Sequence, residues 1–344
     1  MTILVPSYIL EGLPEGLANG CVAWDSGEAD PACLPEVAVF VPPYTAGTED
    51  LAMMARMPRL RVVQTLTAGV DHVLAALPDG VVLCNAAGVH DASTAELAVG
   101  LTIASLRHLD EFARAMPEGR WRYDRHEALA DKRVLIVGFG SIGRAIARRL
   151  DGFECEVRAV ARTPRTVDGI TVSSIDQLPT LLPSADVVIL IVPLTRDTRG
   201  MVDAAFLARM RDGALLVNVA RGPVVDTEAL QAECASGRLR AALDVTDPEP
   251  LPPDHPLWRT PGVLISPHVG GNTSAFLPRA RQLVAAQLRR WEAGEPLANV
   301  LLAGPDSRCP HAIAPDLRAG VLPDPDRPAA RPRDSGTIRD WAAR

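Results

Sequence analysis

Short runs of apolar residues alternate with segments of helical periodicity along most of the chain, and this alternation is typical of α/β proteins. Within the first hundred residues, four apolar runs predict strands, and the segments between them include two predicted helices. The predicted strands are Ile3–Val5, Val37–Val41, Val62–Gln64 and Val81–Cys84, and the predicted helices are Leu51–Met57 and Asp71–Leu77. This part of the chain therefore predicts a small, flavodoxin-like parallel α/β domain.

One long helix is predicted from Ser93 to Ala115, and we expect it to link two domains. Met116–Gly119 ends this helix, and Arg120–Ala130 follows as an irregular connection that carries Trp121. Strands and helices then alternate again, which predicts a second, doubly wound parallel sheet with right-handed crossovers. Its predicted strands are Val134–Val137, Glu156–Ala161, Asp186–Val192, Ala214–Val219, Leu239–Val245 and Val263–Ser266. A helix over Ala280–Trp291 and a segment over Pro296–Val300 close the ordered part.

The length of 344 residues suits two domains better than one. We expect a Rossmann dinucleotide-binding domain over residues 98–283, and a discontinuous substrate domain over residues 1–97 and 284–304. Residues 305–344 contain seven prolines with interleaved Asp and Arg and no sustained apolar period. Such a composition predicts a disordered tail.

The most informative motif is a glycine-rich turn between an apolar strand and a helical segment. Gly138, Gly140 and Gly143 have the G-x-G-x-x-G spacing. In such a turn the first glycine permits the bend, the second lets the backbone approach a pyrophosphate, and the third lets the helix pack on the strand. The helix N-terminus then presents N–H groups to the anion. We predict a dinucleotide site here rather than a merely glycine-rich turn.

Composition and charge argue against several other functions. The net charge of −7 is unfavourable for general nucleic-acid binding and for binding to an anionic membrane surface. No apolar run approaches the roughly 20 residues of a membrane span, and the N-terminus lacks the features of a signal peptide. The six cysteines form no C-x-x-C pair and no cluster with histidine, so we expect neither a metal site nor disulfides. We expect a cytoplasmic protein.

Three polar residues, Arg221, Glu249 and His268, lie at predicted strand ends or in loops after the glycine motif. Because the carboxyl ends of parallel strands face one crevice, all three can converge on one site. Each also has a plainer explanation. Arg221 could pair with Asp226, and Glu249 could be a solvated loop residue. His255 competes with His268, although two glycines soon after His268 favour the latter.

With these residues in place, the chain resembles the D-isomer-specific 2-hydroxyacid dehydrogenases from about residue 60 to residue 300. The resemblance implies that Arg221, Glu249 and His268 are the catalytic set. The ordered segments that carry it are Leu66–Asp71, Asn85–Val89, the glycine motif, Val192–Thr195 with Thr198–Gly200, Ala220–Gly222, Asp244–Pro250 and Ser266–Gly271.

The chemistry of a 2-keto acid reductase is consistent with this set. Reduction needs a hydride at C2 and a proton at the carbonyl oxygen. His268 can give the proton because imidazole titrates near neutral pH, and Glu249, paired to the other ring nitrogen, would favour the charged ring. Arg221 can fork onto the substrate carboxylate. The resemblance implies that backbone N–H groups also bind this carboxylate, namely those of Ala68, Gly69 and Val70.

The resemblance implies a nicotinamide cofactor, and the end of the second predicted strand bears on which one. An NAD enzyme usually carries an acid there, but here the corresponding residue is Ala161. Loss of the carboxylate removes repulsion of a 2′-phosphate, and Arg162, Thr163 and Arg165 could bind it. We therefore favour NADP over NAD, with a surface-exposed basic turn in an NAD enzyme as the alternative. The further contacts implied by the resemblance are Ser141, Ile142, Pro193, Thr198, Val219, Ala220, Asp244, Gly270 and Gly271.

The sequence thus predicts an NAD(P)-dependent 2-hydroxyacid dehydrogenase that reduces a small 2-keto acid such as glyoxylate or hydroxypyruvate, bound in a cleft between the two domains. One alternative is a nucleotide-sensing, corepressor-like binding protein on the same fold. Another is the same enzyme class acting on 3-phosphoglycerate or phosphite; the absence of a fused C-terminal regulatory domain is unfavourable for the first of these substrates. The resemblance also implies a homodimer formed through the long-helix region.

Overall fold

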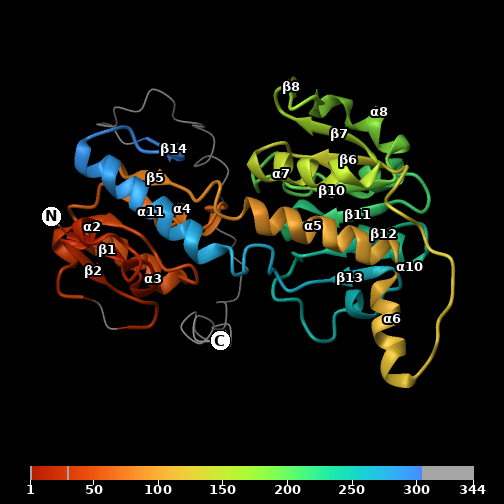
Figure 1. Cartoon of the computed structure of the whole chain (residues 1–344), viewed down its shortest axis with the longest axis horizontal. Helices are drawn as coiled ribbons and strands as arrows, with labels where there is room; N and C mark the ends of the chain where they lie inside the picture. Colours follow the sequence, from red (N-terminus) through yellow and green to blue (C-terminus); the bar gives the residue numbers. More distant parts are fainter. Residues whose placement is uncertain (1, 29–30, 304–344) are drawn as a thin grey trace. The chain divides into compact units, whose positions relative to one another are not determined.

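The computed structural model describes residues 2–28 and 31–303, which form two compact units. Of these described residues, unit 1 comprises those up to Val89 and those from Ser274 to Ala303, and unit 2 is His90–Thr273 (Figure 1). The domain boundaries expected near residues 97 and 284 fall inside the helices Asp91–Leu106 and Phe276–Ala293. Each of these helices lies entirely within one unit. The tail expected from residue 305 lies outside the described residues.

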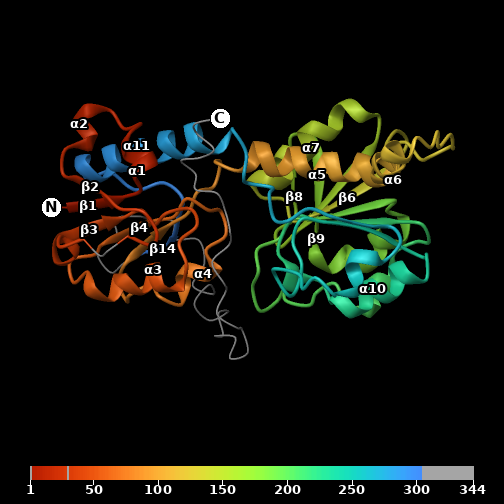
Figure 2. The same cartoon turned by 90° about the horizontal axis from the view of Figure 1, so that it is seen from below.

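Unit 1 is built around a sheet with the strand order β14-β5-β4-β3-β1-β2. Its strands are parallel except β14, which is antiparallel to β5. The strands are β1 (Thr2–Val5), β2 (Cys21–Ala23), β3 (Val37–Phe40), β4 (Val62–Gln64), β5 (Val82–Cys84) and β14 (Val300–Leu302). One face of the sheet packs against α1 (Ser7–Leu10), α2 (Glu15–Ala18) and α11 (Phe276–Ala293), and the other packs against α3 (Thr48–Ala52) and α4 (Asp71–Leu74) (Figure 2).

Unit 2 contains the larger sheet, with the strand order β13-β12-β11-β10-β6-β7-β9-β8. Helices α5 (Asp91–Leu106) and α7 (Ser141–Leu150) cover one face, and α8 (Leu178–Leu181), α9 (Ala204–Arg209) and α10 (Thr227–Ala235) cover the other. The strands are β6 (Arg133–Val137), β7 (Glu156–Ala161), β8 (Arg165–Val167), β9 (Ile170–Ser174), β10 (Val187–Leu190), β11 (Leu215–Asn218), β12 (Arg240–Leu243) and β13 (Val263–Ile265). The expected doubly wound parallel sheet is confirmed.

The register of the central strands aligns their carboxyl ends. Leu190 of β10 pairs with Val137 of β6 and with Asn218 of β11, and Asn218 pairs with Leu243 of β12. The loops that follow these strands therefore leave the sheet at one edge, as expected for a ligand site in an open parallel sheet.

Two features of unit 2 differ from the prediction. The long helix is broken into α5 and α6 (Leu109–Ala115), because His108 adopts a left-handed conformation with φ of 52° that interrupts the helix. The antiparallel hairpin β8–β9 was not predicted. The edge strand β8 is short and largely exposed, and β9, which pairs with both β7 and β8, carries no continuous apolar run. The tight turn of the hairpin uses Asp168 and Gly169, both with positive φ.

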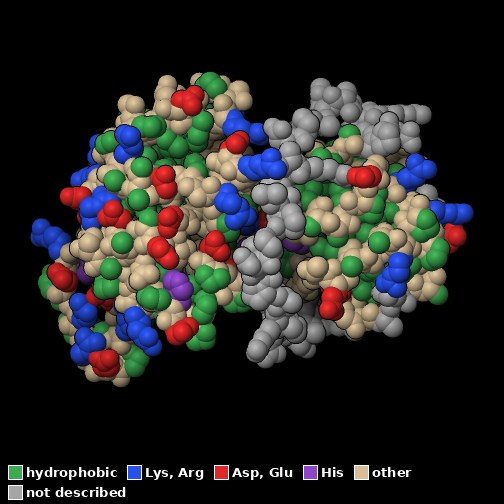
Figure 3. All heavy atoms as spheres, turned by 180° about the vertical axis from the view of Figure 1, so that it is seen from behind, with side chains coloured by type: hydrophobic (Ala, Val, Ile, Leu, Met, Phe, Trp, Pro, Cys, Tyr) green, Lys and Arg blue, Asp and Glu red, His purple; other side chains and the backbone are tan. Residues whose placement is uncertain are grey.

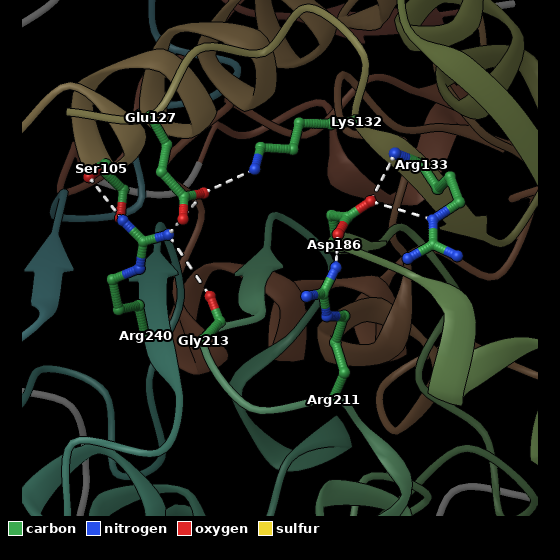
Figure 4. Close-up of polar contacts among 8 residues, drawn as sticks. All are labelled: Ser105, Glu127, Lys132, Arg133, Asp186, Arg211, Gly213 and Arg240. Carbon is green, nitrogen blue, oxygen red and sulfur yellow. Dashed lines mark hydrogen bonds and ion pairs between the residues drawn. The ribbon is translucent and has the colours of Figure 1, made fainter.

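The opposite, amino edge of the same sheet carries a network of ion pairs (Figure 4). Asp186 binds the guanidinium groups of Arg133 and Arg211, and Glu127 binds Lys132 at 2.8 Å and Arg240 at 3.5 Å. These contacts tie the segment before β6 to the amino ends of the strands. On the face drawn in Figure 3, basic and acidic side chains are interspersed over the described surface. None of the helices within residues 2–28 and 31–303 combines the length and apolar character of a membrane span.

Candidate active site

The glycine turn joins β6 to α7, and two of its three glycines are required by the fold itself. Gly138 has φ of 103°, and a Cβ added to it would lie 2.3 Å from the carbonyl oxygen of Ile191. A Cβ at Gly143 would lie 2.3 Å from the carbonyl oxygen of Gly138. Real Cβ atoms do not approach oxygen so closely, so a side chain at either position would displace backbone.

Gly140 is different, because nothing in the described chain requires it to be glycine. Its φ of −81° is ordinary, and no described heavy atom lies within 4 Å of an added Cβ. The open space lies at the N-terminus of α7, whose N-cap provides no side-chain hydrogen bond to the first-turn N–H groups. Such a terminus is suited to an anion. The residues present therefore fit a dinucleotide pyrophosphate that approaches the backbone at Gly140.

The neighbouring residues that were predicted to contact the cofactor lie around this turn. The Ser141 hydroxyl donates to Asp91 Oδ1 at 3.1 Å, so it is engaged with the start of α5. Ile142 packs against the core. In the loop after β10, the Thr198 hydroxyl donates to the carbonyl oxygen of Pro193 at 2.6 Å and closes the loop.

The basic segment after β7 spans residues 162–165, and one of its two arginines is hydrogen-bonded to the glycine turn. Arg162 and Thr163 are exposed. Arg165 is anchored, because its guanidinium donates to the carbonyl oxygens of Phe139, at 2.6 Å, and Thr163, at 2.9 Å. Since Phe139 belongs to the glycine turn, Arg165 links the basic segment to that turn.

His268 lies in a turn that is organised by the buried carboxylate of Asp244, which is 3% exposed. Oδ1 of Asp244 accepts from the Ser266 hydroxyl at 2.6 Å and from Val269 N at 2.9 Å, and Oδ2 accepts from Gly270 N at 2.9 Å. His268 itself has φ of 54°, a conformation that is costly for a non-glycine residue. The hydrogen bonds to Asp244 stabilise this conformation.

The Asp244 turn also bears on the predicted cofactor contacts. A Cβ on Gly270 would lie 2.9 Å from Asp244 Oδ2, so the packing of the turn itself favours glycine at this position. Three of the roughly four acceptor positions of a carboxylate are used within the turn, which leaves Oδ2 able to accept one more hydrogen bond.

The structure brings His268 and Glu249 together across 19 residues of sequence. His268 Nδ1 lies 2.6 Å from Glu249 Oε1, the distance of a strong, charge-assisted hydrogen bond. The side chains are 36% and 24% exposed, respectively. Glu249 is therefore not simply a solvated loop residue, and it orients the imidazole through one ring nitrogen.

Arg221 follows β11. Asp226, the alternative partner of Arg221, and His255, the alternative to His268, each cap a helix. The Asp226 carboxylate caps α10 by accepting from Ala229 N at 3.0 Å. His255 caps a short 3-10 helix, with its Nδ1 accepting from Leu257 N at 3.2 Å. The Arg221 guanidinium donates to the carbonyl oxygen of Ala220 at 2.8 Å.

Val219 and Ala220, two of the predicted cofactor contacts, are buried. The side chain of Asn218 binds the turn that carries Arg221 and was not among the predicted site residues. A polar residue at the end of an otherwise apolar strand is the signal that could have identified it.

In unit 1, the turn after β4 has its carbonyl groups bound by side chains. Thr67 Oγ1 donates to the carbonyl oxygen of Gly69 at 2.8 Å, and Asn85 Nδ2 donates to that of Ala68 at 2.7 Å. Among the described residues, no acceptor binds the backbone N–H groups of Ala68, Gly69 or Val70. Consecutive N–H groups of this kind can bind an anion.

Comparisons with known proteins agree on one family. Residues 99–270 match the family described as D-isomer specific 2-hydroxyacid dehydrogenase, NAD binding domain. The chain is 34% identical over 250 residues to the glyoxylate reductase of Thermofilum pendens, covering 70% of this chain and 74% of that protein. It is 33% identical over 309 residues to glyoxylate/hydroxypyruvate reductase A of Serratia proteamaculans, covering 85% and 93%.

A solved structure leads to the same family. The D-isomer specific 2-hydroxyacid dehydrogenase of Xanthobacter autotrophicus, in complex with NADPH and MES, is 32% identical and superposes with a TM-score of 0.74, covering 88% of this chain and 97% of that one. The chain therefore belongs to the D-isomer-specific 2-hydroxyacid dehydrogenases, oxidoreductases that act on CH–OH donors with a nicotinamide cofactor.

Proposed function

We propose that this protein is an NADP-preferring reductase of a small 2-keto acid of the glyoxylate or hydroxypyruvate type. The observation that carries the proposal is the hydrogen bond of 2.6 Å between His268 Nδ1 and Glu249 Oε1, in a turn held by Asp244. When bound, the nicotinamide cofactor supplies the hydride. The protein supplies the proton and the binding site for the substrate.

His268 is the proposed general acid. Because Nδ1 is engaged by Glu249, the proton that goes to the keto oxygen comes from Nε2, and among the described residues no hydrogen bond engages that nitrogen. Hydride addition at C2 breaks the carbonyl π bond, and its electrons go to the oxygen that takes the proton. The product is the 2-hydroxy acid.

The substrate carboxylate needs cationic or N–H donors, and each unit by itself offers such groups. Arg221 provides a guanidinium that can bind a carboxylate in a bidentate manner. The turn at Ala68, Gly69 and Val70 provides three backbone N–H groups without acceptors in the described chain. We propose Arg221 as the carboxylate-binding group of unit 2 and this turn as the carboxylate-binding set of N–H groups of unit 1.

The decisive experiment measures keto-acid-dependent NADPH oxidation by Arg221→Ala and His268→Ala. A general acid contributes about 10²- to 10⁴-fold, so His268→Ala should lose at least about 100-fold in kcat. Wild-type turnover in both variants would exclude the proposal. Tight NADPH binding by the native protein, without turnover of any acid in a panel of 2-keto acids, would instead favour the corepressor-like alternative.

The preference for NADP is supported by the basic segment after β7. Arg162 and Thr163 are exposed, and the end of the strand carries Ala161 rather than an acid. We expect Arg162→Ala to raise the KM for NADPH about tenfold or more, the value of one charge-assisted hydrogen bond, and to leave the KM for NADH nearly unchanged. Equal effects on both cofactors would contradict the assignment of Arg162 to the 2′-phosphate.

We further propose a homodimer that buries the segment from α6 to residue 123. Trp121 and Tyr123 are each 93% exposed, and Met116 is 77% exposed, which is unusual for apolar side chains in one short segment. The segment follows α6 along the outside of unit 2 (Figure 1). Trp121→Ser with Tyr123→Ser should give a monomer in analytical ultracentrifugation. Trp258→Ser, which removes a 47% exposed tryptophan elsewhere, should not change the assembly.

A further inference from the structure

Asn218 is a buried amide at the carboxyl end of β11, three residues before Arg221. It is 1% exposed and pairs in register with Leu190 of β10 and Leu243 of β12, so it lies in the middle of the sheet. Burying a carboxamide is unfavourable unless its donor and acceptor are both satisfied. The partners of this side chain therefore indicate why the residue is there.

Both ends of the Asn218 carboxamide bind the backbone of the turn that carries Arg221. Oδ1 accepts from Ala220 N at 3.0 Å, and Nδ2 donates to the carbonyl oxygen of Arg221 at 3.0 Å. The same carbonyl accepts from Val224 N at 3.2 Å, which begins the next turn of chain. The backbone of residues 220 and 221 is thus held by one buried side chain.

The guanidinium of Arg221 depends on the same turn. It donates to the carbonyl oxygen of Ala220 at 2.8 Å, and the N–H of Ala220 is the group that Asn218 binds. A shift of Ala220 would therefore displace both the backbone origin of the Arg221 side chain and the carbonyl that its guanidinium contacts. The turn is closely packed as well, because a Cβ at Gly222 would lie 1.9 Å from the carbonyl oxygen of Thr246.

We infer that Asn218 is a positioning residue that orients Arg221 for the substrate carboxylate, an inference that rests on the proposed function of Arg221. A carboxamide of this length supplies one acceptor and one donor to this turn. Aspartate keeps the acceptor but cannot donate to the Arg221 carbonyl when it is ionised, and alanine supplies neither group. The residue type is therefore matched to the two backbone groups that it binds.

The test compares Asn218→Ala and Asn218→Asp with the wild-type chain in kcat/KM for glyoxylate, in the inhibition constant of oxamate and in the Kd for NADPH. Misplacement of a binding group by about 1 Å can cost on the order of 100-fold, so we expect kcat/KM to fall about 10- to 100-fold. The inhibition constant of oxamate, an unreactive carboxylate analogue, should rise by a similar factor. The Kd for NADPH should rise by a smaller factor than the oxamate constant, because the turn at Gly140 is not altered and only the predicted cofactor contacts at Val219 and Ala220 lie next to Asn218.

A double-variant comparison separates positioning from general destabilisation. If Asn218 acts through Arg221, then Asn218→Ala should cause almost no further loss of kcat/KM in an Arg221→Ala background. Thr102→Val is the matched control, because Thr102 is also fully buried and donates only to the carbonyl oxygen of Ala98 within α5, at 2.7 Å. Thr102→Val should leave the oxamate constant unchanged.

The outcomes distinguish the inference from the function on which it rests. Full activity of Arg221→Ala would remove the role of Arg221 on which the inference rests, and wild-type turnover of His268→Ala as well would exclude the proposed function itself. If Arg221→Ala loses activity but Asn218→Ala lowers kcat/KM by the same factor in the Arg221→Ala background as in the wild-type chain, only the positioning role is overturned. An unchanged inhibition constant of oxamate in Asn218→Asp would also overturn only that role. If Asn218→Ala does not fold, Asn218→Ser carries the same comparison, because its hydroxyl can still accept from Ala220 N.

Discussion

The three glycines of the turn after β6 should respond differently to a single added methyl group. At Gly140 the Cβ would enter open space, and φ is compatible with alanine. At Gly143 it would lie 2.3 Å from a backbone oxygen. Gly140→Ala therefore tests ligand binding, whereas Gly143→Ala tests the fold.

The two substitutions should change the stability in opposite directions, and Gly140→Ala should also weaken dinucleotide binding. Alanine for glycine at a compatible φ stabilises a protein by about 0.4–1 kcal/mol, so Gly140→Ala should not lower the Tm. Overpacking of the kind expected for Gly143→Ala costs about 1–3 kcal/mol or more. If the Cβ at position 140 prevents one hydrogen bond between the backbone and a phosphate, worth about 1.5–3 kcal/mol, the Kd for the dinucleotide should rise about 10- to 140-fold.

The assay pairs a thermal melt of the free protein with a fluorescence titration by NADPH. Gly152→Ala is the matched control, because its Cβ also meets no described atom within 4 Å and its φ is not positive. Both readouts should remain at wild-type values in this control. Wild-type NADPH affinity in Gly140→Ala would refute the reasoning about the pyrophosphate, and a large fall in its Tm would refute the reasoning about open space.

Three further predictions concern stability and reactivity. Partial burial favours the neutral form of Asp186, but hydrogen bonds from Arg133 and the charges of Arg133 and Arg211 outweigh it and lower the pKa of this carboxyl. A lowered folded-state pKa gives stability that is fully present above the unfolded pKa of about 3.9 and is lost as the pH falls through the folded-state pKa. The deficit of Asp186→Asn in urea midpoint should therefore be clear at pH 7 and smaller at pH 3, and an equal deficit at both pH values would contradict this. Burial raises the pKa of the Cys234 thiol to about 12, so this thiol should not react in the folded protein. Cys234→Ser should therefore lower the number of thiols that react with a disulfide reagent only after denaturation. A fall in the number that react in the native protein would show that the thiol is accessible. Gly222→Ala should lower the Tm more than any other substitution proposed for this turn, because its Cβ would lie 1.9 Å from a carbonyl oxygen; a wild-type melt would show that the turn can move.

Most of the fold could be predicted, because buried parallel strands are apolar on both faces and stand out as continuous runs. Glu156–Ala161 was predicted with the bounds that the structure has, and the core strands at Val187–Leu190 and Leu215–Asn218 were predicted within two residues. The edge strands β2 and β8 were missed, because half-exposed edge strands carry no such run. The break at His108 was missed, because the apolar spacing of a helix does not report one residue with positive φ.

The sequence by itself determined the class of fold, the position of the glycine turn and the three polar residues that follow the strands. These features are local, since each depends on the residue types within a short stretch of chain and on strand ends that a parallel sheet aligns. Only the tertiary structure decided which groups meet, because hydrogen bonds such as those of Glu249 with His268 and Asp244 with Gly270 join residues many positions apart. It also separated Gly140 from Gly138 and Gly143, because the space in front of a glycine is set by backbone that arrives from elsewhere in the chain.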